Sequence, residues 1–271
     1  MLPADLAARL RHASTRLGPF GAEWHHYPDV GSTNDVAAAL AARGAAHGTV
    51  VVADTQTAGR GRHGSVWFSP PGSGLYLSVL LRSLSSPVLT LATGVAVAEA
   101  LQVGAGLAVT LEWPNDVVVA RQGRPRKVAG ILAEAATMRE RVEWVIMGIG
   151  INLQDAAWPS ELADRAGSVE GLTGRPVDPA GLIVELLAAL ATGCAEIGSG
   201  ATARVLGRWE ALAPSSRGAT VEWSVGAVRH RGVTEGIDDQ GALLVRVGSR
   251  RERLIGGEVR HVRGGDDATG D

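Results

Sequence analysis

Apolar segments alternate with short polar turns along most of the chain, and their lengths predict a mixture of helices and strands. Segments of ten or more residues with helical spacing predict helices, whereas nearly continuous apolar runs of four to eight residues predict buried strands. Polar residues at 32–35 precede one of the helices and are good helix-capping residues. The predicted helices are 2–11, 32–44, 89–101, 179–197 and 202–212, and the predicted strands are 49–53, 75–81, 109–113, 117–120, 127–136 and 142–148.

The pattern changes after Pro214. Short segments rich in β-forming residues follow one another, separated by Gly and Asp turns, at 220–225, 228–237, 243–246 and 251–255. This spacing is typical of a small barrel. We therefore predict an α+β domain at 1–213, a small β-barrel at 214–263 and a disordered tail at 264–271. A barrel this small is marginal alone, so we expect it to pack on the larger domain.

Composition excludes several classes of protein. The 271 residues are 45% hydrophobic and carry a formal net charge of −2, so the chain lacks the broad basic surface that binding to nucleic acid requires. We find no apolar run of about 18 residues that would span a membrane, and no signal peptide at the N-terminus. Cys194 stands alone, which excludes an internal disulfide and a cysteine metal cluster. We expect a cytoplasmic protein.

Lysine and asparagine are scarce. Among 26 basic residues Lys127 is the single lysine, and asparagine occurs only at positions 34, 115 and 152. Arginine cannot replace lysine where a compact point charge is needed. Since a GC-rich genome would remove both residue types, the survivors mark positions where a substitute fails, although chance also allows this pattern. Each asparagine falls within a short motif that carries candidate chemistry.

The first such motif is the glycine- and arginine-rich loop 59–64, which follows the first buried strand. Its glycines have dinucleotide-fingerprint spacing, but Trp67 and two prolines follow instead of a helix, and the other signatures of a kinase are missing. Arg60 and Arg62 can each bind phosphate or carboxylate oxygens through two N–H groups. The loop is therefore predicted to close over a polyanion and exclude water; the alternative is a solvated surface loop.

The second motif, residues 113–116, reads Trp-Pro-Asn-Asp and ends a strand at Pro114. Asp116 could hold Mg²⁺, which proteins bind through one or two carboxylates together with phosphates; the alternative is an ordinary hairpin turn. Lys127 begins the next predicted strand, where an ammonium can neutralise a carboxylate and an attacked phosphate together. The third motif, 148–153, brackets apolar residues with glycines. There Asn152 can contact a base edge, although a glycine-rich strand end also fits.

Together these motifs resemble the biotin protein ligase family. The match comprises 32–34, 56–64, 113–116, 127, 129–132 and 148–152, in the family's order and approximate spacing. The resemblance implies an α+β fold, with a mixed-sheet catalytic domain of the class II synthetase-like, biotin–lipoate ligase type and a small SH3-like β-barrel after it. It also implies two reactions. Biotin and Mg·ATP give biotinyl-5′-AMP and pyrophosphate, and biotin then passes to a lysine of a biotin carboxyl carrier protein, with release of AMP.

The resemblance assigns roles to individual residues. Lys127, Arg60 and Arg62 are expected to be catalytic, and Asp116 is the expected ligand of Mg²⁺. The expected biotin site is Ser32, Thr33, Asn34, Gln56, Gly59, Arg60, Gly61, Arg62, Lys127 and Gly130. The expected ATP site is Arg62, Trp67, Asn115, Lys127 and Asn152. No tightly bound prosthetic group, nucleic acid or membrane partner is expected, and the protein should be a monomer or weak homodimer.

The chain departs from the family pattern in three places. His63 and Ser65 stand where the family frequently has arginine, which predicts one missing cationic contact. The turn between Asp116 and Lys127 is longer than in some members. We also expect no helix-turn-helix module before Ser32, and hence no repressor role.

Two other functions fit parts of the sequence. A lipoate ligase or octanoyltransferase resembles the same fold, but Gln56, the arginine-rich loop and the C-terminal barrel argue against it. A non-catalytic binding module is disfavoured by the single lysine and by the confinement of asparagine to three motifs. The histidines other than His63 show no metal-ligand spacing and are predicted to be structural or exposed.

Overall fold

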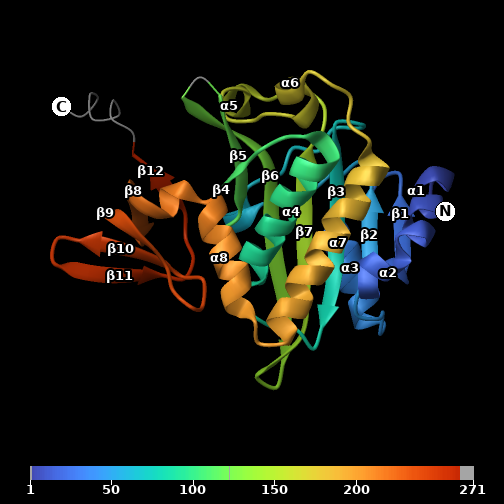
Figure 1. Ribbon diagram of the computed structural model, residues 1–271, viewed down its shortest axis with the longest axis horizontal. Helices are drawn as coiled ribbons and strands as arrows, with labels where there is room; N and C mark the ends of the chain where they lie inside the picture. Colours follow the sequence, from blue (N-terminus) through green and yellow to red (C-terminus); the bar gives the residue numbers. More distant parts are fainter. Residues whose placement is uncertain (1, 122, 263–271) are drawn as a thin grey trace.

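The computed structural model describes residues 2–121 and 123–262. Position 263 and the predicted tail at 264–271 lie outside the described residues. Two sheets organise the chain, a large mixed sheet and a small sheet at one end of the molecule (Figure 1). The large sheet has the strand order β1-β2-β3-β7-β6-β5-β4, in which β1 and β2 are parallel and all other neighbours are antiparallel. Its strands are β1 (Trp24–Tyr27), β2 (Val50–Ala53), β3 (Gly74–Arg82), β4 (Thr110–Glu112), β5 (Asp116–Arg121), β6 (Arg124–Met138) and β7 (Arg141–Asn152).

Helices cover the large sheet on both faces. They are α1 (Ala4–His12), α2 (Ser14–Leu17), α3 (Thr33–Ala42), α4 (Leu89–Ala105), α5 (Ser160–Ala163), α6 (Val169–Thr173), α7 (Pro179–Gly198) and α8 (Thr202–Leu212), with 3-10 turns at Gly18–Gly21, Arg62–Gly64 and Pro214–Ser216. Figure 1 shows α4 and α7 side by side across one face. Strand β3 is buried along Leu75–Leu81 because helices lie on both sides of it.

Alternation along the central strands divides the sheet into two faces. Ile149 and Ile151 of β7 join the large hydrophobic core beneath α4 and α7. On the opposite face, Ile146 of β7 and Leu80 of β3 pack with Ala37 of α3 in a smaller cluster. Successive side chains in a strand point to opposite faces, so the even-numbered positions at the end of β7 face away from the large core.

Helix α7 is the one helix among the described residues that is long and apolar enough to cross a membrane, by length and composition alone. Ten of its residues are buried, including Leu182, Leu186 and Leu190, and it packs on α4 within the hydrophobic core. Its apolar sequence is thus accounted for as that of a core helix.

The predicted elements are confirmed apart from their ends and a few omissions. The connection between the strands predicted at 117–120 and 127–136 is shorter than expected, because β6 begins at Arg124, which pairs with Arg121 of β5. Arg121 and Arg124 are exposed while their backbone pairs within the sheet, so the polar residues did not mark the end of the strand. Strand β1 was not predicted since its Trp-His-His-Tyr sequence is half-buried throughout and shows no apolar run.

The small sheet follows α8. Its strands are β8 (Arg217–Val225), β9 (Val228–Ile237), β10 (Leu243–Val247), β11 (Arg250–Leu254) and β12 (Val259–His261), all antiparallel, in the order β11-β10-β9-β8-β12. No pairing joins β11 to β12 among the described residues, so closure into a barrel is not found. The sheet packs on the larger part of the chain, where Trp113 Nε1 donates to the Gly241 carbonyl at 3.0 Å and Val221 joins the main core.

Candidate functional site

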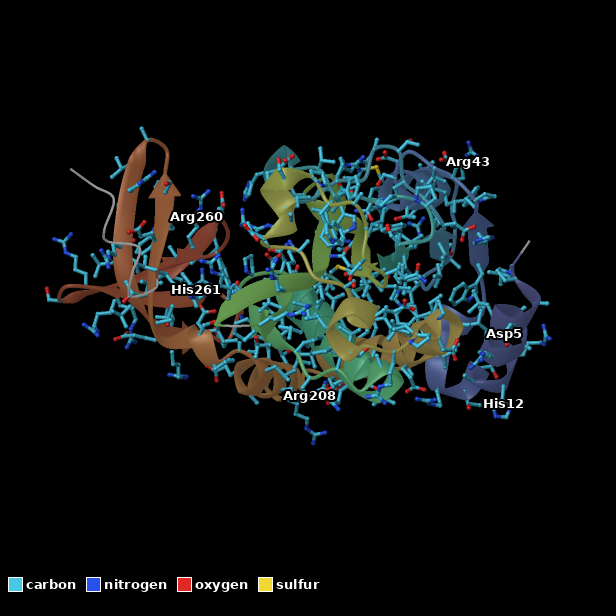
Figure 2. All side chains as sticks on the ribbon, turned by 90° about the horizontal axis from the view of Figure 1, so that it is seen from above. Asp5, His12, Arg43, Arg208, Arg260 and His261 are labelled. Atoms are coloured by element: carbon cyan, nitrogen blue, oxygen red, sulfur yellow. The ribbon has the colours of Figure 1, made fainter. Side chains whose placement is uncertain are left out.

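A cavity of about 1090 Å³ opens on the face of the large sheet that bears α3. Its walls come from the loop before β3, the ends of β6 and β7, and the turn between β4 and β5. Glu258 and His261 add a contribution from the C-terminal segment, and Figure 2 shows His261 where the small sheet meets the body of the molecule. Every predicted site residue lines this cavity except Gly59.

Gly59 lies behind the cavity wall. A methyl group on this residue would come within 2.7 Å of the Trp67 carbonyl oxygen and 2.8 Å of Ser69 Oγ. The Trp67 N–H donates to the Gly59 carbonyl at 2.9 Å, which closes the loop at its base. Gly59 therefore provides space for a tight loop and does not line the cavity.

The floor of the cavity is built from the start of α3 and the segment that follows β2. Ser32 occupies the N-cap position, which confirms the predicted helix start, but its side chain makes no capping bond. Its buried hydroxyl is therefore left to the cavity. The Thr33 N–H donates to Gln56 Oε1 at 2.9 Å, and Gln56 Nε2 donates to Ser69 at 3.2 Å. Together these groups present hydroxyl and amide groups in a mostly buried corner.

The loop over the cavity folds as a small hairpin. The Gly61 N–H donates to the Ser65 carbonyl at 2.7 Å, and Ser65 Oγ donates to the Arg62 carbonyl at 2.8 Å. His63 adopts a left-handed conformation with φ of 54° at the tip. A side chain on Gly61 would meet Ser65 Oγ, which explains the glycine at that position. Ser65 thus stabilises the turn at a position where the sequence predicted only the loss of a cation.

Arg60 and Arg62 point in different directions. Arg60 makes two hydrogen bonds of 2.7 Å to the Asp35 carboxylate and a longer one, 3.2 Å, to Glu134. The hydrogen bond from Arg60 lowers the pKa of Asp35, and Asp35 in turn raises the pKa of Arg60. Arg62 is half-buried and donates to Asn115 Oδ1 and the Gly257 carbonyl, both at 3.2 Å. Burial lowers the pKa of Arg62, and the charge of Asp116 opposes that shift.

Lys127 lies within β6 and bridges two walls of the cavity. Its Nζ is 2.7 Å from Asp116 Oδ1 and 5.4 Å from the centre of the Trp67 ring, a distance that permits a cation–π interaction. Asp116 faces it from β5. Residues 2–121 and 123–262 contain no group of three or more His, Cys, Asp or Glu side chains that could hold a metal ion. The residues alone would therefore supply only part of a metal-ion coordination shell.

Trp67 lies flat on two glycines. Gly130 of β6 and Gly150 of β7 are direct cross-strand partners, and a methyl group would come within 2.9 Å of the ring at Gly130 and 2.5 Å at Gly150. The indole Nε1 is buried and has no hydrogen-bond partner. The glycine pair thus forms a flat seat for an aromatic ring on the open face of the sheet.

Asn152 completes this end of the cavity. Its Nδ2 donates to the carbonyls of Lys127 and Gly167 at 3.2 and 3.1 Å. The Lys127 N–H donates to the Arg165 carbonyl at 2.7 Å, so the backbone around the lysine is held from both sides. In this structure the amide N–H of Asn152 positions Lys127, a contact that the sequence did not predict.

Two residues that the sequence did not indicate lie behind the polar lining and form hydrogen bonds with it. Ser78 is a fully buried hydroxyl on β3, and Glu134 joins α3 to the arginine-rich loop. A serine within the apolar run Leu75–Leu81 was a usable signal for Ser78. Glu134 carried none, because an acidic residue near a strand end is usually exposed to solvent.

Comparisons with known proteins cover both sheets. Residues 29–152 match the Biotin/lipoate A/B protein ligase family, and residues 226–262 match the Biotin protein ligase C terminal domain. The chain is 34% identical over 244 residues to the bifunctional ligase/repressor BirA of Bacillus spizizenii, with 86% of this chain and 72% of that protein covered. It is 35% identical over 237 residues to the biotin--[acetyl-CoA-carboxylase] ligase of Paracoccus denitrificans, with 84% and 96% covered. A solved structure of the biotin protein ligase from Aquifex aeolicus in complex with biotin and ATP superposes with a TM-score of 0.76 at 28% identity, over 90% of this chain and 100% of that one.

Proposed function

Because the chain belongs to the biotin/lipoate A/B protein ligase family and is a biotin protein ligase, we propose that the cavity beneath the arginine-rich loop is its active site. The enzyme activates biotin with ATP to biotinyl-5′-AMP and then transfers biotin to a protein lysine. The observation that carries the assignment is that the three sequence motifs, far apart along the chain, all line one cavity.

Biotin is assigned to the corner formed by Ser32, Thr33 and Gln56. A ureido group has one acceptor oxygen and two N–H donors. The hydroxyl and amide groups of this corner include both hydrogen-bond donors and acceptors. These polar groups are mostly buried, so a ligand that leaves them unpaired binds far more weakly. The valeryl chain would then run beneath the loop toward Lys127, which places the biotin carboxylate near the ammonium.

The adenylation step follows from the charges at that end. A biotin carboxylate oxygen attacks the α-phosphorus of ATP, the bond to the bridging oxygen breaks, and pyrophosphate leaves. Lys127 and Arg62 stabilise the negative charge that develops on the phosphorus. Asp116 is 35% exposed at its side chain and lines the cavity, so it could hold Mg²⁺ together with phosphate oxygens and water. An ion bound there would neutralise phosphate charge. The nucleotide base is assigned to the region of Trp67, Asn115 and Asn152.

The second step needs an acceptor lysine, and we infer that a biotin carboxyl carrier protein supplies it. The free amine attacks the acyl carbon of the mixed anhydride, and AMP leaves as the acyl–oxygen bond breaks. No covalent enzyme intermediate is required. Catalysis would come from positioning and charge, and no side chain is assigned as a general base.

We infer that the carrier docks along the outer edge of β6. Strand β5 pairs with β6 only as far as Gly130, and the Ile131 N–H donates outward to the Asn115 carbonyl. By strand alternation the N–H groups of Ala133 and Ala135 point the same way, and no backbone partner for them occurs in the described ranges. An exposed edge of this kind can accept a strand from another protein.

Substituting Ala135→Pro is expected to slow biotin transfer about tenfold while leaving adenylation within about twofold, because one outward donor is lost from an edge strand. Transfer to a purified carrier domain and pyrophosphate exchange would be measured on the same preparation. Ala135→Val, which keeps the N–H, is the control. Equal transfer rates for the two variants would place the carrier elsewhere.

Three further assignments are proposals of the same kind. We infer a domain boundary near residue 213, and an SH3-like barrel after it, because residues 226–262 match the family's C-terminal domain. We infer a cytoplasmic location, because the sequence holds a single cysteine and so forms no internal disulfide. A monomer or weak homodimer is expected, and sedimentation with and without biotin and ATP tests it.

The test of the proposed site and of its substrate is exchange of labelled pyrophosphate into ATP. Exchange is expected with biotin and not with lipoate, because lipoate lacks the ureido group that the buried corner would bind. Exchange with lipoate instead would transfer the assignment to the lipoate branch of the family. No exchange with either acid would contradict the adenylation mechanism.

A further inference from the structure

A continuous set of hydrogen bonds links the proposed biotin corner to the arginine-rich loop. It starts at Gln56, whose Oε1 accepts from Thr33. Ser78 Oγ lies 2.7 Å from Thr33 Oγ1 and 2.6 Å from Asn34 Oδ1. Asn34 Nδ2 then donates to Glu134 Oε2 at 2.6 Å. Both amide atoms of Asn34 are therefore occupied by protein groups, one toward the biotin corner and one toward β6.

Glu134 carries this connection to the loop. Arg60 Nη2 lies 3.2 Å from each Glu134 carboxylate oxygen and also binds Asp35. The loop arginine is thus held between a carboxylate from α3 and a carboxylate from β6. Asn34 cannot move without disturbing the carboxylate that holds the loop, because its Nδ2 donates to Glu134. A methyl group on Gly148 would come within 2.4 Å of Asn34 Oδ1, so the glycine leaves the space that Asn34 needs.

We propose that Glu134 is a positioning residue that couples occupancy of the biotin corner to closure of the 59–67 loop. The inference rests on the placement of biotin proposed above. A ureido group bound at Thr33 secures the hydrogen bonds that run from Thr33 through Ser78 to Asn34. Asn34 then fixes the Glu134 carboxylate, which holds Arg60 and with it the closed loop. Arg60 thus holds the loop closed by binding the carboxylates of Asp35 and Glu134. Arg62 points to the opposite wall and is the loop arginine that remains available to bind substrate.

The size of the effect follows from exposure. The side chains of Arg60 and Glu134 are 36% and 38% exposed, so their ion pair is screened by solvent and contributes modestly. The hydrogen bond from Asn34, which is buried, is the better protected part of the connection. Loss of the Glu134 charge should therefore loosen the loop without unfolding the site. The substitution should weaken biotin binding and leave the chemical step nearly unchanged, because Lys127 and Arg62 keep their contacts.

The experiment compares Glu134→Gln with the wild-type enzyme in biotin-dependent pyrophosphate exchange. We expect KM for biotin to rise about tenfold and kcat to change by less than about twofold, since the interaction serves binding and not the transition state. Glutamine keeps the size of the side chain but loses the charge, and its NH₂ group cannot accept the hydrogen bond that the second carboxylate oxygen accepts from Arg60. Glu134→Asp, which keeps the charge at a shorter reach, should recover part of the loss.

A second readout follows the loop directly. Arg60 and Arg62 are trypsin sites, so cleavage within the loop reports its opening. Biotin should protect the wild-type loop and should fail to protect Glu134→Gln, whereas Glu143→Gln, an exposed carboxylate on β7 outside the cavity, should behave as wild type. Unchanged KM together with normal protection would overturn the proposal. A loss of wild-type exchange would instead contradict the proposed function, and the two failures are therefore distinguishable.

Discussion

Replacing Lys127 by arginine is expected to lower biotin-dependent pyrophosphate exchange by at least about a hundredfold, or roughly 2.7 kcal/mol of transition-state stabilisation. The Lys127 ammonium is a compact charge placed between Asp116 and the Trp67 ring, and its Cε would lie only 3.1 Å from a methyl group on Gly130. A guanidinium is larger and planar, and it would bind the Asp116 carboxylate through two N–H groups. The positive charge would remain in the variant, but it would no longer lie where the Lys127 ammonium lies.

The matched control lies one residue earlier on the same strand. Arg126 lies outside the cavity lining and donates to the Ala163 carbonyl, so Arg126→Lys makes the reverse exchange of residue types. Arg126→Lys should change the rate of pyrophosphate exchange by less than about twofold, because the charge is kept and the side chain lies outside the cavity. An unimpaired Lys127→Arg enzyme would leave the ligase assignment intact and remove the special role of this lysine.

The parts of the site that could be predicted are those that local sequence determines. The run Gly148-Ile149-Gly150-Ile151-Asn152 predicted a strand end that a flat group can approach. The structure gives the reason, because Ile149 and Ile151 enter the core while Gly148 and Gly150 face the cavity. A two-residue period thus encodes one packed face and one open face. The lone lysine and the three asparagines likewise all line the cavity.

The parts that could not be predicted depend on contacts distant in sequence. Nothing near Arg60 reveals that its partners are Asp35 and Glu134, which lie 25 and 74 positions away. The sequence therefore assigned both loop arginines to substrate, although only the fold decides which of them a protein carboxylate already holds. Closure of the small sheet is similar in kind, because strand spacing predicts hairpins but not whether the two end strands meet.

Substituting Gly150→Ala is expected to raise KM for ATP at least about tenfold. The added methyl would lie 2.5 Å from Trp67 Cε2 and 2.6 Å from Nε1, well inside van der Waals contact. Overpacking of this kind typically costs about 1–3 kcal/mol. The backbone of Gly150 does not adopt a left-handed conformation, so the expected penalty is the steric conflict with the ring. The Trp67 ring would move away from Gly130 and Gly150, and the surface proposed to contact the nucleotide base would be lost.

A double-mutant cycle shows whether the ring carries the effect. Trp67→Leu alone should also raise KM for ATP, and adding Gly150→Ala to it should then cost little more, because the clash has been removed. Coupling between residues in contact is non-additive in this way. Gly207→Ala on α8, with nothing within 4 Å of the new methyl, controls for the change of residue type and should leave KM unaltered. Additive losses in the double variant would mean that Gly150 contacts the nucleotide by itself, and that Trp67 has a separate role.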